Sequence, residues 1–350
     1  MRRIIKYGIL ALCLISTIAY WKHQDLTPTL SRYLPNHFNE TFGRETAAAQ
    51  PYLIHDHKEE IDDDLELNPT TSVDDIVPVG SSSLKSRFGK ITASFGDPDP
   101  PYEDAIASHD LHNELHGYPH FILREHMIRG LWSKHGWIMT ILGNELAKPE
   151  DERLEWLLWH DRDTVLMNPQ TPLDIFVPPK DNFSDINLLV TNDRNGLNNG
   201  VFMVRVGQWA FKLFASALSI REYEPNIKLK YTEQSAMEEV MKRPWWASGV
   251  AYVPQRWFNG FPPNDDDDKR NKPASSRPGS LLIHFASNRD GLRPDRMAHW
   301  GKIAKTRTAE WDKPANETGY LNEIAEYWER IGRGESQESV IDDVGKRPWR

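Results

Sequence analysis

The stretch Glu155-Trp-Leu-Leu-Trp-His-Asp-Arg-Asp-Thr-Val-Leu-Met-Asn-Pro169 joins an apolar, aromatic run to two closely spaced acidic residues. The run at residues 156–159 is long enough for a buried strand and too short for a helix. It is followed by Asp161 and Asp163, and residues i and i+2 of an extended chain point to the same side. We therefore predict a buried strand whose end presents two carboxylates to one point.

Two carboxylates at the end of a strand suit a divalent cation. In open α/β sheets, ligands bind in the crevice outside the strand ends. Hard oxygen donors at that place suit Mn²⁺ or Mg²⁺, which a diphosphate also binds. The alternative is a solvated turn, since Asp-x-Asp is frequent by chance. The rest of the chain favours the metal site.

Composition limits the classes of protein that fit. The chain has 350 residues, of which 39% are hydrophobic and 27% charged, enough for one large domain with appendages. The net charge is −9 and no basic cluster is interleaved with aromatic residues, which argues against a nucleic-acid partner. The 13 Trp residues suit flat, half-polar ligands such as sugars, although core packing explains most Trp residues. Cys13 is the only cysteine, which excludes an intrachain disulfide.

The sequence pattern of residues 1–21 predicts a membrane anchor. Three basic residues within positions 1–6 precede an uncharged stretch at residues 7–21. Counted from Ile4, a helix here spans roughly 27 Å, which suits a thin early-secretory bilayer. The charge order predicts a cytoplasmic tail at 1–6, a transmembrane signal anchor at 7–21 and a luminal body, hence a single-pass type II protein. A cleaved signal peptide is the alternative, but the bulky Tyr20-Trp21 pair favours the anchor.

Residues 22–87 predict a disordered stem. They are polar, acidic and poor in periodic apolar residues, so they bury too little surface to offset the entropy of ordering. An acidic segment that binds a partner is the alternative to a spacer. Glycosylation sequons begin at Asn39, Asn182 and Asn316, in agreement with a luminal body.

Residues 88–335 predict one α/β domain, followed by a polar tail at 336–350. Short apolar runs alternate with helix-period segments, which is the rhythm of a mostly parallel, nucleotide-binding sheet. The expected strands are 91–95, 120–124, 156–159, 186–191, 201–205, 250–253 and 281–285. The expected helices are 102–116, 137–147, 208–218, 231–240 and 323–330.

Two polar segments of this domain are candidates for ligand binding. The loop at 192–200 packs side-chain amides and Asp193 between glycines, and this density of donors and acceptors fits sugar hydroxyls. Ordinary turn formation also explains its Asn-Gly pairs. A helix that starts with Thr232 as its N-cap places Glu233 and Gln234 in its first turn, where a binding cleft could contact them. Favourable helix-dipole chemistry is the alternative for the acidic residue.

The strand at 281–285 contributes a third candidate metal ligand. His284 lies near its end. A lone histidine is more often packed than ligating. At the mouth of a sheet that already offers Asp161 and Asp163, however, it becomes a candidate ligand.

Five blocks of the chain occur in the order found in one known family. The blocks are Trp156-Leu-Leu-Trp-His-Asp-Arg-Asp-Thr, Thr191-Asn-Asp-Arg-Asn-Gly-Leu-Asn-Asn-Gly-Val-Phe, Glu233-Gln-Ser-Ala, Val253-Pro-Gln-Arg and Ile283-His-Phe-Ala. With them the chain resembles the fungal galactosyl/mannosyl transferases of glycosyltransferase family 34, whose plant relatives are xyloglucan xylosyltransferases. The resemblance covers about residues 88–305.

The resemblance implies a GT-A fold in a single nucleotide-sugar-binding domain, a Mn²⁺ or Mg²⁺ cofactor and retention of anomeric configuration. The expected enzyme is a Golgi membrane hexosyltransferase that moves galactose or mannose from a nucleotide sugar to a glycan acceptor and forms an α-linkage. GDP-mannose and UDP-galactose are the expected donors, although the sequence does not decide between these and UDP-xylose. Other Golgi transferase subunits are further expected partners.

The resemblance also implies roles for single residues. They form a metal-binding set, a catalytic set near the anomeric carbon and a substrate-binding set. The metal-binding set is Asp161, Asp163 and His284, the catalytic set is Glu233, Gln234 and Asp193, and the substrate-binding set is Asn198, Asn199 and, on position alone, Arg289.

Four residues depart from the family pattern. His160 replaces an apolar or aromatic residue, Arg162 stands between the two carboxylates, Arg194 stands where Trp is common, and Ser287 replaces a frequent Gly. Added cationic groups near a metal site weaken metal binding by repulsion unless they face outward. The alternative function is therefore a non-catalytic glycan-binding or assembly subunit of a Golgi glycosyltransferase complex.

Overall fold

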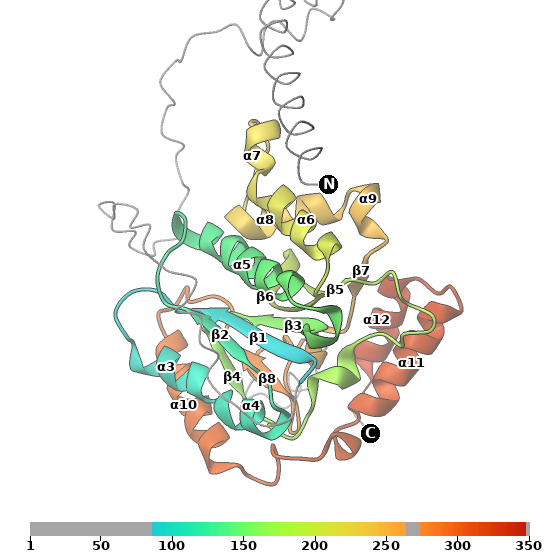
Figure 1. The fold of residues 1–350 in the computed structure, drawn as a ribbon. Helices are drawn as coiled ribbons and strands as arrows, with labels where there is room; N and C mark the ends of the chain where they lie inside the picture. Colours follow the sequence, from blue (N-terminus) through green and yellow to red (C-terminus); the bar gives the residue numbers. More distant parts are fainter. Residues whose placement is uncertain (1–85, 264–273, 348–350) are drawn as a thin grey trace, which may run out of the picture. The chain divides into compact units, whose positions relative to one another are not determined.

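The computed structural model describes residues 86–263 and 274–347, which are built on a six-stranded sheet (Figure 1). The predicted cytoplasmic tail, signal anchor and stem lie outside the described residues. Within the described ranges, no helix has the length and apolar character needed to cross a membrane.

The six-stranded sheet is mixed and mostly parallel, as predicted. Its order is β2-β1-β3-β6-β5-β7, and only β6 pairs antiparallel to its neighbours. The strands are β1 (Phe88–Ala93), β2 (His120–Leu123), β3 (Trp156–His160), β5 (Leu188–Asp193), β6 (Gly196–Arg205) and β7 (Val250–Tyr252). A separate antiparallel pair joins β4 (Thr164–Leu166) to β8 (Leu282–His284).

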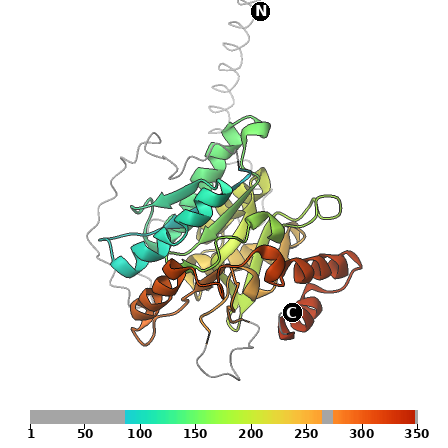
Figure 2. The same ribbon diagram turned by 90° about the horizontal axis from the view of Figure 1, so that it is seen from below.

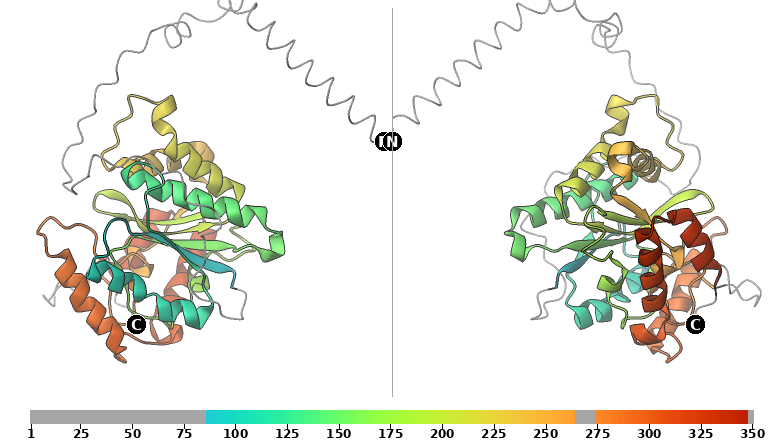
Figure 3. Two further views of the ribbon diagram at one scale, coloured as in Figure 1. Left: turned by 60° about the vertical axis from the view of Figure 1, so that its left-hand side comes forward. Right: turned by 90° about the vertical axis from the view of Figure 1, so that its right-hand side faces the viewer.

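Helices cover both faces of this sheet (Figure 1). The α-helices are α3 (Pro100–Ala107), α4 (Asp110–His116), α5 (Ser133–Ala147), α6 (Gln208–Leu218), α7 (Ile220–Tyr223), α8 (Thr232–Met241), α9 (Pro244–Ala247), α10 (Arg293–Thr306), α11 (Tyr320–Gly332) and α12 (Gln337–Lys346). The helices α5, α6 and α8 lie on one face, and Figure 3 shows this layer from two sides. Figure 2, seen from below, shows the orange and red C-terminal helices at the opposite face.

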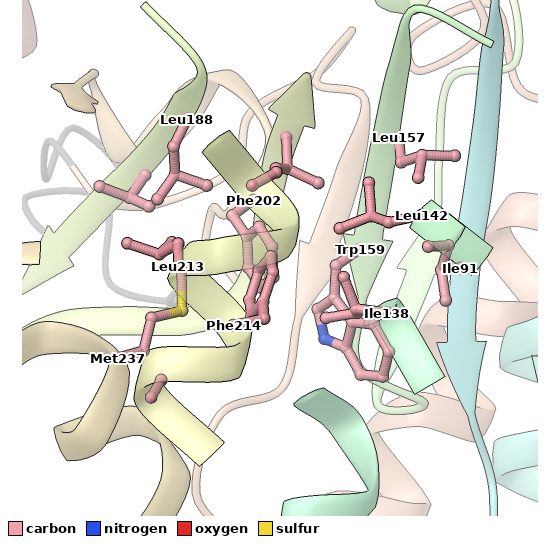
Figure 4. Packing of buried hydrophobic residues seen from close by; sticks show 14 of the residues in the cluster. Ile91, Ile138, Leu142, Leu157, Trp159, Leu188, Phe202, Leu213, Phe214 and Met237 are labelled. Carbon is pink, nitrogen blue, oxygen red and sulfur yellow. The ribbon is translucent and has the colours of Figure 1, made fainter. Parts of the chain in front are cut away.

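Strand β3 is buried on both faces of the sheet and lies at the centre of the domain. Leu157 and Trp159 belong to the core under α5, α6 and α8, part of which Figure 4 shows. Trp156 and Leu158 belong to the core that α11 closes. All five residues of β3 are buried, which explains why the strand is apolar at its first four positions, before His160 at its end. This central strand carries the two aspartates that follow it.

Several elements differ from the sequence-based expectation, and strand β4 and helix α10 were not predicted. The predicted helix 102–116 is two helices, α3 and α4, and His109 between them is fully buried. The predicted loop 192–200 is a tight hairpin, since β5 runs to Asp193 and β6 begins at Gly196, whose φ of 104° suits glycine. The predicted polar tail contains α12, because Val340 and Val344 share one helical face and pack in the core with α11.

Candidate active site

The two aspartates lie in the turn that connects β3 to β4. Asp161 is half-buried and Asp163 is 7% exposed. The β4–β8 pairing brings His284 beside them, because the Phe285 N–H donates to the Asp163 carbonyl oxygen at 2.9 Å. One ligand atom from each of Asp161, Asp163 and His284 lies within 4.8 Å of the others. The structure therefore brings the predicted metal-binding set together.

The imidazole of His284 is fixed in place by its surroundings. Its ring lies so close to Gly200 that a Cβ there would come within 2.1 Å of it, which only glycine avoids. Its Nδ1 bonds the Oδ1 of Asn259 at 2.7 Å, so Nδ1 carries the proton. Its Nε2 lies 3.5 Å from Asp163 Oδ1 and keeps its lone pair on the side of the carboxylates. Two carboxylates and one such imidazole are a donor set that fits Mn²⁺, and with less preference Mg²⁺.

Two basic residues that the sequence analysis did not select contact these carboxylates. Lys134 Nζ, on α5, lies 3.0 Å from Asp161 Oδ1 and 2.6 Å from the Asn199 carbonyl oxygen. Arg293 Nη1, at the start of α10, lies 3.1 Å from Asp163 Oδ2. No pattern in the sequence marks either residue, because each reaches the site from a helix far away along the chain.

The charge of Asp163 is set by these neighbours. Burial alone would raise the pKa of this carboxyl. The His284 imidazole, when it is doubly protonated, and the Arg293 guanidinium reverse the effect and hold the pKa of Asp163 below its usual range. The carboxylate is therefore ionised at neutral pH, as a metal ligand must be.

Arg289 is not part of this arrangement. Its side chain is exposed, and Arg293, four positions later, is the residue that contacts Asp163. The contact of Arg289 with a diphosphate stays a prediction, whereas α10, which begins at Arg293, directs that residue to Asp163.

The β5–β6 hairpin carries the predicted sugar-binding residues. Asp193 accepts from the Asn195 N–H at 2.6 Å and from Asn198 Nδ2 at 3.0 Å. The Asn199 N–H donates to Gln234 Oε1 at 3.2 Å, which links the hairpin to α8. Within the described part of the chain, the buried Asn199 Nδ2 has no hydrogen-bond partner. It is a donor that a ligand oxygen would satisfy.

Glu233 is buried in the first turn of α8, 5% exposed. The N-cap of α8 is Tyr231 and not the predicted Thr232, whose hydroxyl donates to Glu233 Oε2 at 2.7 Å. With a φ of 41°, Thr232 has the left-handed backbone that β-branched residues rarely adopt. Burial raises the pKa of Glu233. The positive charge of Lys134 and the hydrogen bond from the Thr232 hydroxyl oppose this rise, whereas the negative charge of the nearby Asp161 adds to it.

The four departures from the family pattern add no positive charge to the metal-binding set. Burial lowers the pKa of His160 to about 3, so the ring is neutral. The Arg162 side chain points elsewhere: it donates to the Phe95 carbonyl oxygen at 3.2 Å and lies over the Tyr102 ring at 4.3 Å. Arg194 is exposed at the hairpin turn. Ser287 has a φ of 81°, a conformation that favours glycine.

The fold and the site first define a class of protein. The chain has an α/β domain with a mostly parallel sheet, and an acidic candidate metal site lies beside the end of a strand. A hairpin rich in side-chain amides lies next to this site. The model of the galactosyl transferase GMA12/MNN10 family matches residues 173–290, which include the hairpin, Glu233 and His284. Within these residues the chain matches this family, and the curated relatives described below carry names of the same family. The predicted family and the predicted enzyme class, a hexosyltransferase, are therefore confirmed.

The chain is similar to two curated yeast proteins. An uncharacterized alpha-1,2-galactosyltransferase, C637.06 of Schizosaccharomyces pombe, is 26% identical over 242 residues, which cover 57% of this chain and 67% of the relative. The probable alpha-1,6-mannosyltransferase MNN10 of Saccharomyces cerevisiae is 27% identical, over 31% of this chain and 34% of its own length.

Among solved structures, a glycosyltransferase involved in the glycosylation of the major capsid of PBCV-1 aligns with a TM-score of 0.45. It is 15% identical, and the alignment covers 61% of this chain and 98% of that one.

Proposed function

We propose that this chain is a metal-dependent, retaining hexosyltransferase of GT-A type. It moves galactose or mannose from a nucleotide sugar to a glycan acceptor and forms an α-linkage. The observation that carries the proposal is the convergence of Asp161, Asp163 and His284 at the end of the central strand. The relatives named above, an uncharacterized α-1,2-galactosyltransferase and a probable α-1,6-mannosyltransferase, support a hexose as the transferred sugar.

The residues around the metal-binding set, which is the triad Asp161, Asp163 and His284, suit a diphosphate leaving group. A Mn²⁺ or Mg²⁺ ion held by the triad would supply positive charge that stabilises the departing nucleoside diphosphate. Lys134 fixes the Asp161 carboxylate, and Arg293 fixes that of Asp163, so the ligands are oriented before substrate arrives. Both cations also add positive potential at this end of the sheet.

The residues facing the sugar suit retention. Because Asp161 and Asp163 are assigned to the ion, Glu233 and Asp193 remain as the acidic candidates. Asp193 is engaged by Asn198 and the Asn195 N–H, which fits a residue that shapes the sugar-holding hairpin. Glu233 is buried near Asp161 and Lys134, so its negative charge is placed to support an anomeric carbon that becomes positive. In this assignment Gln234 holds the hairpin against α8.

The proposed location is the Golgi membrane, with the described domain in the lumen and a single-pass type II anchor. The sequence before residue 86 supports this part of the proposal, through three basic residues followed by an uncharged stretch. The sequon residues Asn182 and Asn316 are both exposed, as glycan attachment requires. Digestion of the domain by protease in sealed microsomes without detergent would show that the orientation is wrong.

Donor turnover tests the proposed activity. The purified chain is incubated with GDP-mannose, UDP-galactose or UDP-xylose, with Mn²⁺ or with chelator. We expect hydrolysis or transfer from one hexose donor only when Mn²⁺ is present. A non-catalytic glycan-binding or assembly subunit would turn over none of them, and equal rates with chelator would remove the metal. An anomeric coupling constant typical of a β-linked product would refute retention.

A further inference from the structure

Asn259 lies at the centre of the hydrogen-bond network behind the metal-binding set. It follows the short turn Gln255–Trp257, and its side chain has no exposed surface. Its Oδ1 accepts from His284 Nδ1 at 2.7 Å. Its Nδ2 faces four oxygens, and every one of them is an acceptor in this arrangement. They are Thr191 Oγ1 at 2.8 Å, Asn198 Oδ1 at 3.1 Å, the Asn198 carbonyl at 3.2 Å and the Val201 carbonyl at 3.3 Å.

These neighbours fix which way the amide of Asn259 points. A carbonyl oxygen in the position of Nδ2 would meet backbone carbonyls that cannot donate. The nitrogen must therefore face Asn198 and Val201, and the oxygen must face His284. This orientation leaves His284 one tautomer, with the proton on Nδ1 and the lone pair of Nε2 directed to the carboxylates.

The same amide continues the network to the sugar-binding hairpin. Asn259 Nδ2 donates to Asn198 Oδ1, and Asn198 Nδ2 donates to Asp193 Oδ2 at 3.0 Å. Asn198 Oδ1 also accepts from the Gly200 N–H at 3.0 Å, and Gly200 is the residue on which the His284 ring rests. One buried amide therefore sets the position of a metal ligand and of the hairpin together.

We infer that Asn259 is a positioning residue that selects the metal-binding tautomer of His284 and holds Asn198 in register with it. The inference rests on the proposed function, because it assigns His284 to a divalent cation. Asn259 itself is not one of the three candidate ligands. Removing an outer partner of a metal-ligating histidine typically weakens metal affinity about 10–100-fold.

The variant Asn259→Leu is the direct probe, since it removes both halves of the amide at similar volume. Thr191→Val is the matched control. It removes an acceptor of the Asn259 amide and leaves the His284 contact intact. Gln255→Leu is a second control. It removes a buried side-chain amide from the same turn, and that amide donates to the Asn259 backbone carbonyl oxygen at 3.1 Å.

The first measurement is Mn²⁺ affinity of the full chain, taken from the electron paramagnetic resonance signal of free Mn²⁺ with UDP and with GDP present. We expect Asn259→Leu to weaken affinity about 10–100-fold, and both controls to stay within about twofold of the parent. An Asn259→Leu protein that binds Mn²⁺ like the parent would overturn the inference.

The second measurement is the tautomer of His284 by nitrogen NMR of metal-free protein, with His284→Ala used to assign the signal. We expect the Nδ1–H form in the parent and its loss in Asn259→Leu. An Nε2–H form in the parent overturns the inference even if the leucine variant does not fold. A parent that binds no Mn²⁺ but shows the Nδ1–H form would instead contradict the proposed function alone.

Discussion

Two buried polar regions meet at Asp161: one holds charged groups of both signs, and the histidine rings of the other are neutral. One is the metal-binding set with its partners Lys134 and Arg293. The other, which we name the histidine cluster, lies on the opposite side of the same turn and consists of Lys90, His109, His120 and His160. Thr164 joins the two regions, because its hydroxyl donates to the Asp161 carbonyl oxygen at 2.8 Å and lies 2.9 Å from His160 Nδ1.

The histidine cluster satisfies its own hydrogen bonds. Asn113 Nδ2 lies 3.2 Å from His120 Nδ1, and His120 Nε2 lies 2.9 Å from His160 Nε2. These contacts form one directional chain if every ring is neutral: His120 donates to His160, and His160 Nδ1 donates to Thr164. The ring of His109 stacks on that of His160 with centroids 3.9 Å apart. Burial lowers the pKa of His109 and of His120 well below 6.5, which keeps them neutral.

The metal-binding set can bind a ligand, whereas the histidine cluster cannot. In the metal-binding set, charges of both signs remain and three donor atoms converge with one carboxylate half-exposed. In the histidine cluster, the rings are neutral, bonded to one another and closed to solvent. The His160 departure is thus structural: a polar residue at the end of β3 is tolerated because neighbouring histidines and Thr164 satisfy it.

The largest expected effect follows from Asp163→Asn. The change removes a charged ligand at little cost in volume, and metal stabilisation of a leaving group is worth several kcal/mol. We expect turnover to fall about 10³-fold with a melting temperature close to that of the parent. Steady-state kinetics with Mn²⁺ and circular dichroism measure the two quantities. Full activity of the variant in chelator would contradict a metal site here.

Glu233→Gln has the next largest expected effect. Its charge matters most when positive charge develops at the anomeric carbon, so turnover should fall about 10²-fold while donor affinity changes little. Single-turnover rates and donor binding by calorimetry separate these quantities. Unchanged turnover would remove Glu233 from the site and leave the family assignment intact.

The two regions also differ in their response to acid. Unfolded histidines titrate near pH 6.5, whereas the buried rings have lowered pKa values, so below pH 6.5 the unfolded chain binds more protons. Stability should therefore fall as pH falls below 6.5, and His160, whose pKa burial lowers to about 3, should account for about 2 kcal/mol of that loss between pH 6.5 and 5. Urea unfolding at pH 7 and pH 5 measures the loss, and an equal free energy of unfolding at both would contradict neutral rings.

His135 provides the internal comparison for this experiment. Burial lowers its pKa to about 3, and neither ring nitrogen has a hydrogen-bond partner among the described residues. His135→Leu should therefore lose about 2 kcal/mol less than the parent between pH 6.5 and 5. An identical loss would show that His135 already binds a proton in the folded chain.

Arg162→Ala has the smallest expected effect. The side chain lies over Tyr102 and faces away from the triad, so Mn²⁺ affinity and turnover should stay within about twofold of the parent. The free energy of unfolding should fall by about 0.5–1 kcal/mol for the lost cation–π contact. A marked gain in Mn²⁺ affinity would show that Arg162 opposes the ion after all.

Sequence reasoning reached the parts of the molecule that local pattern determines. The apolar run before Asp161 predicted a buried strand, and β3 follows it with one added residue, His160. The helix predicted at 208–218 is α6 with the same bounds, because its apolar spacing is regular. Asp161, Asp163 and His284 were selectable because each stands at the end of a predicted strand.

The rest depended on contacts between distant segments. Lys134 and Arg293 reach the carboxylates from two different helices, and nothing local distinguishes them from surface cations. Asn259 follows a short turn with no periodic pattern, and its importance comes only from the hairpin and His284 that surround it. The sequence predicts a loop where the hairpin at Gly196 lies, because asparagine is common both in loops and in hairpin turns.

The central claim is that Asp161, Asp163 and His284 hold a divalent cation on which a nucleoside diphosphate also binds. Pulsed electron-nuclear double resonance of Mn²⁺ bound to the chain, with UDP and with GDP, tests it most directly. We predict hyperfine coupling to phosphorus with one of the two nucleotides. We also predict coupling to an imidazole nitrogen that disappears in His284→Ala. Bound Mn²⁺ without nitrogen coupling, or with a spectrum unchanged in that variant, would contradict the account.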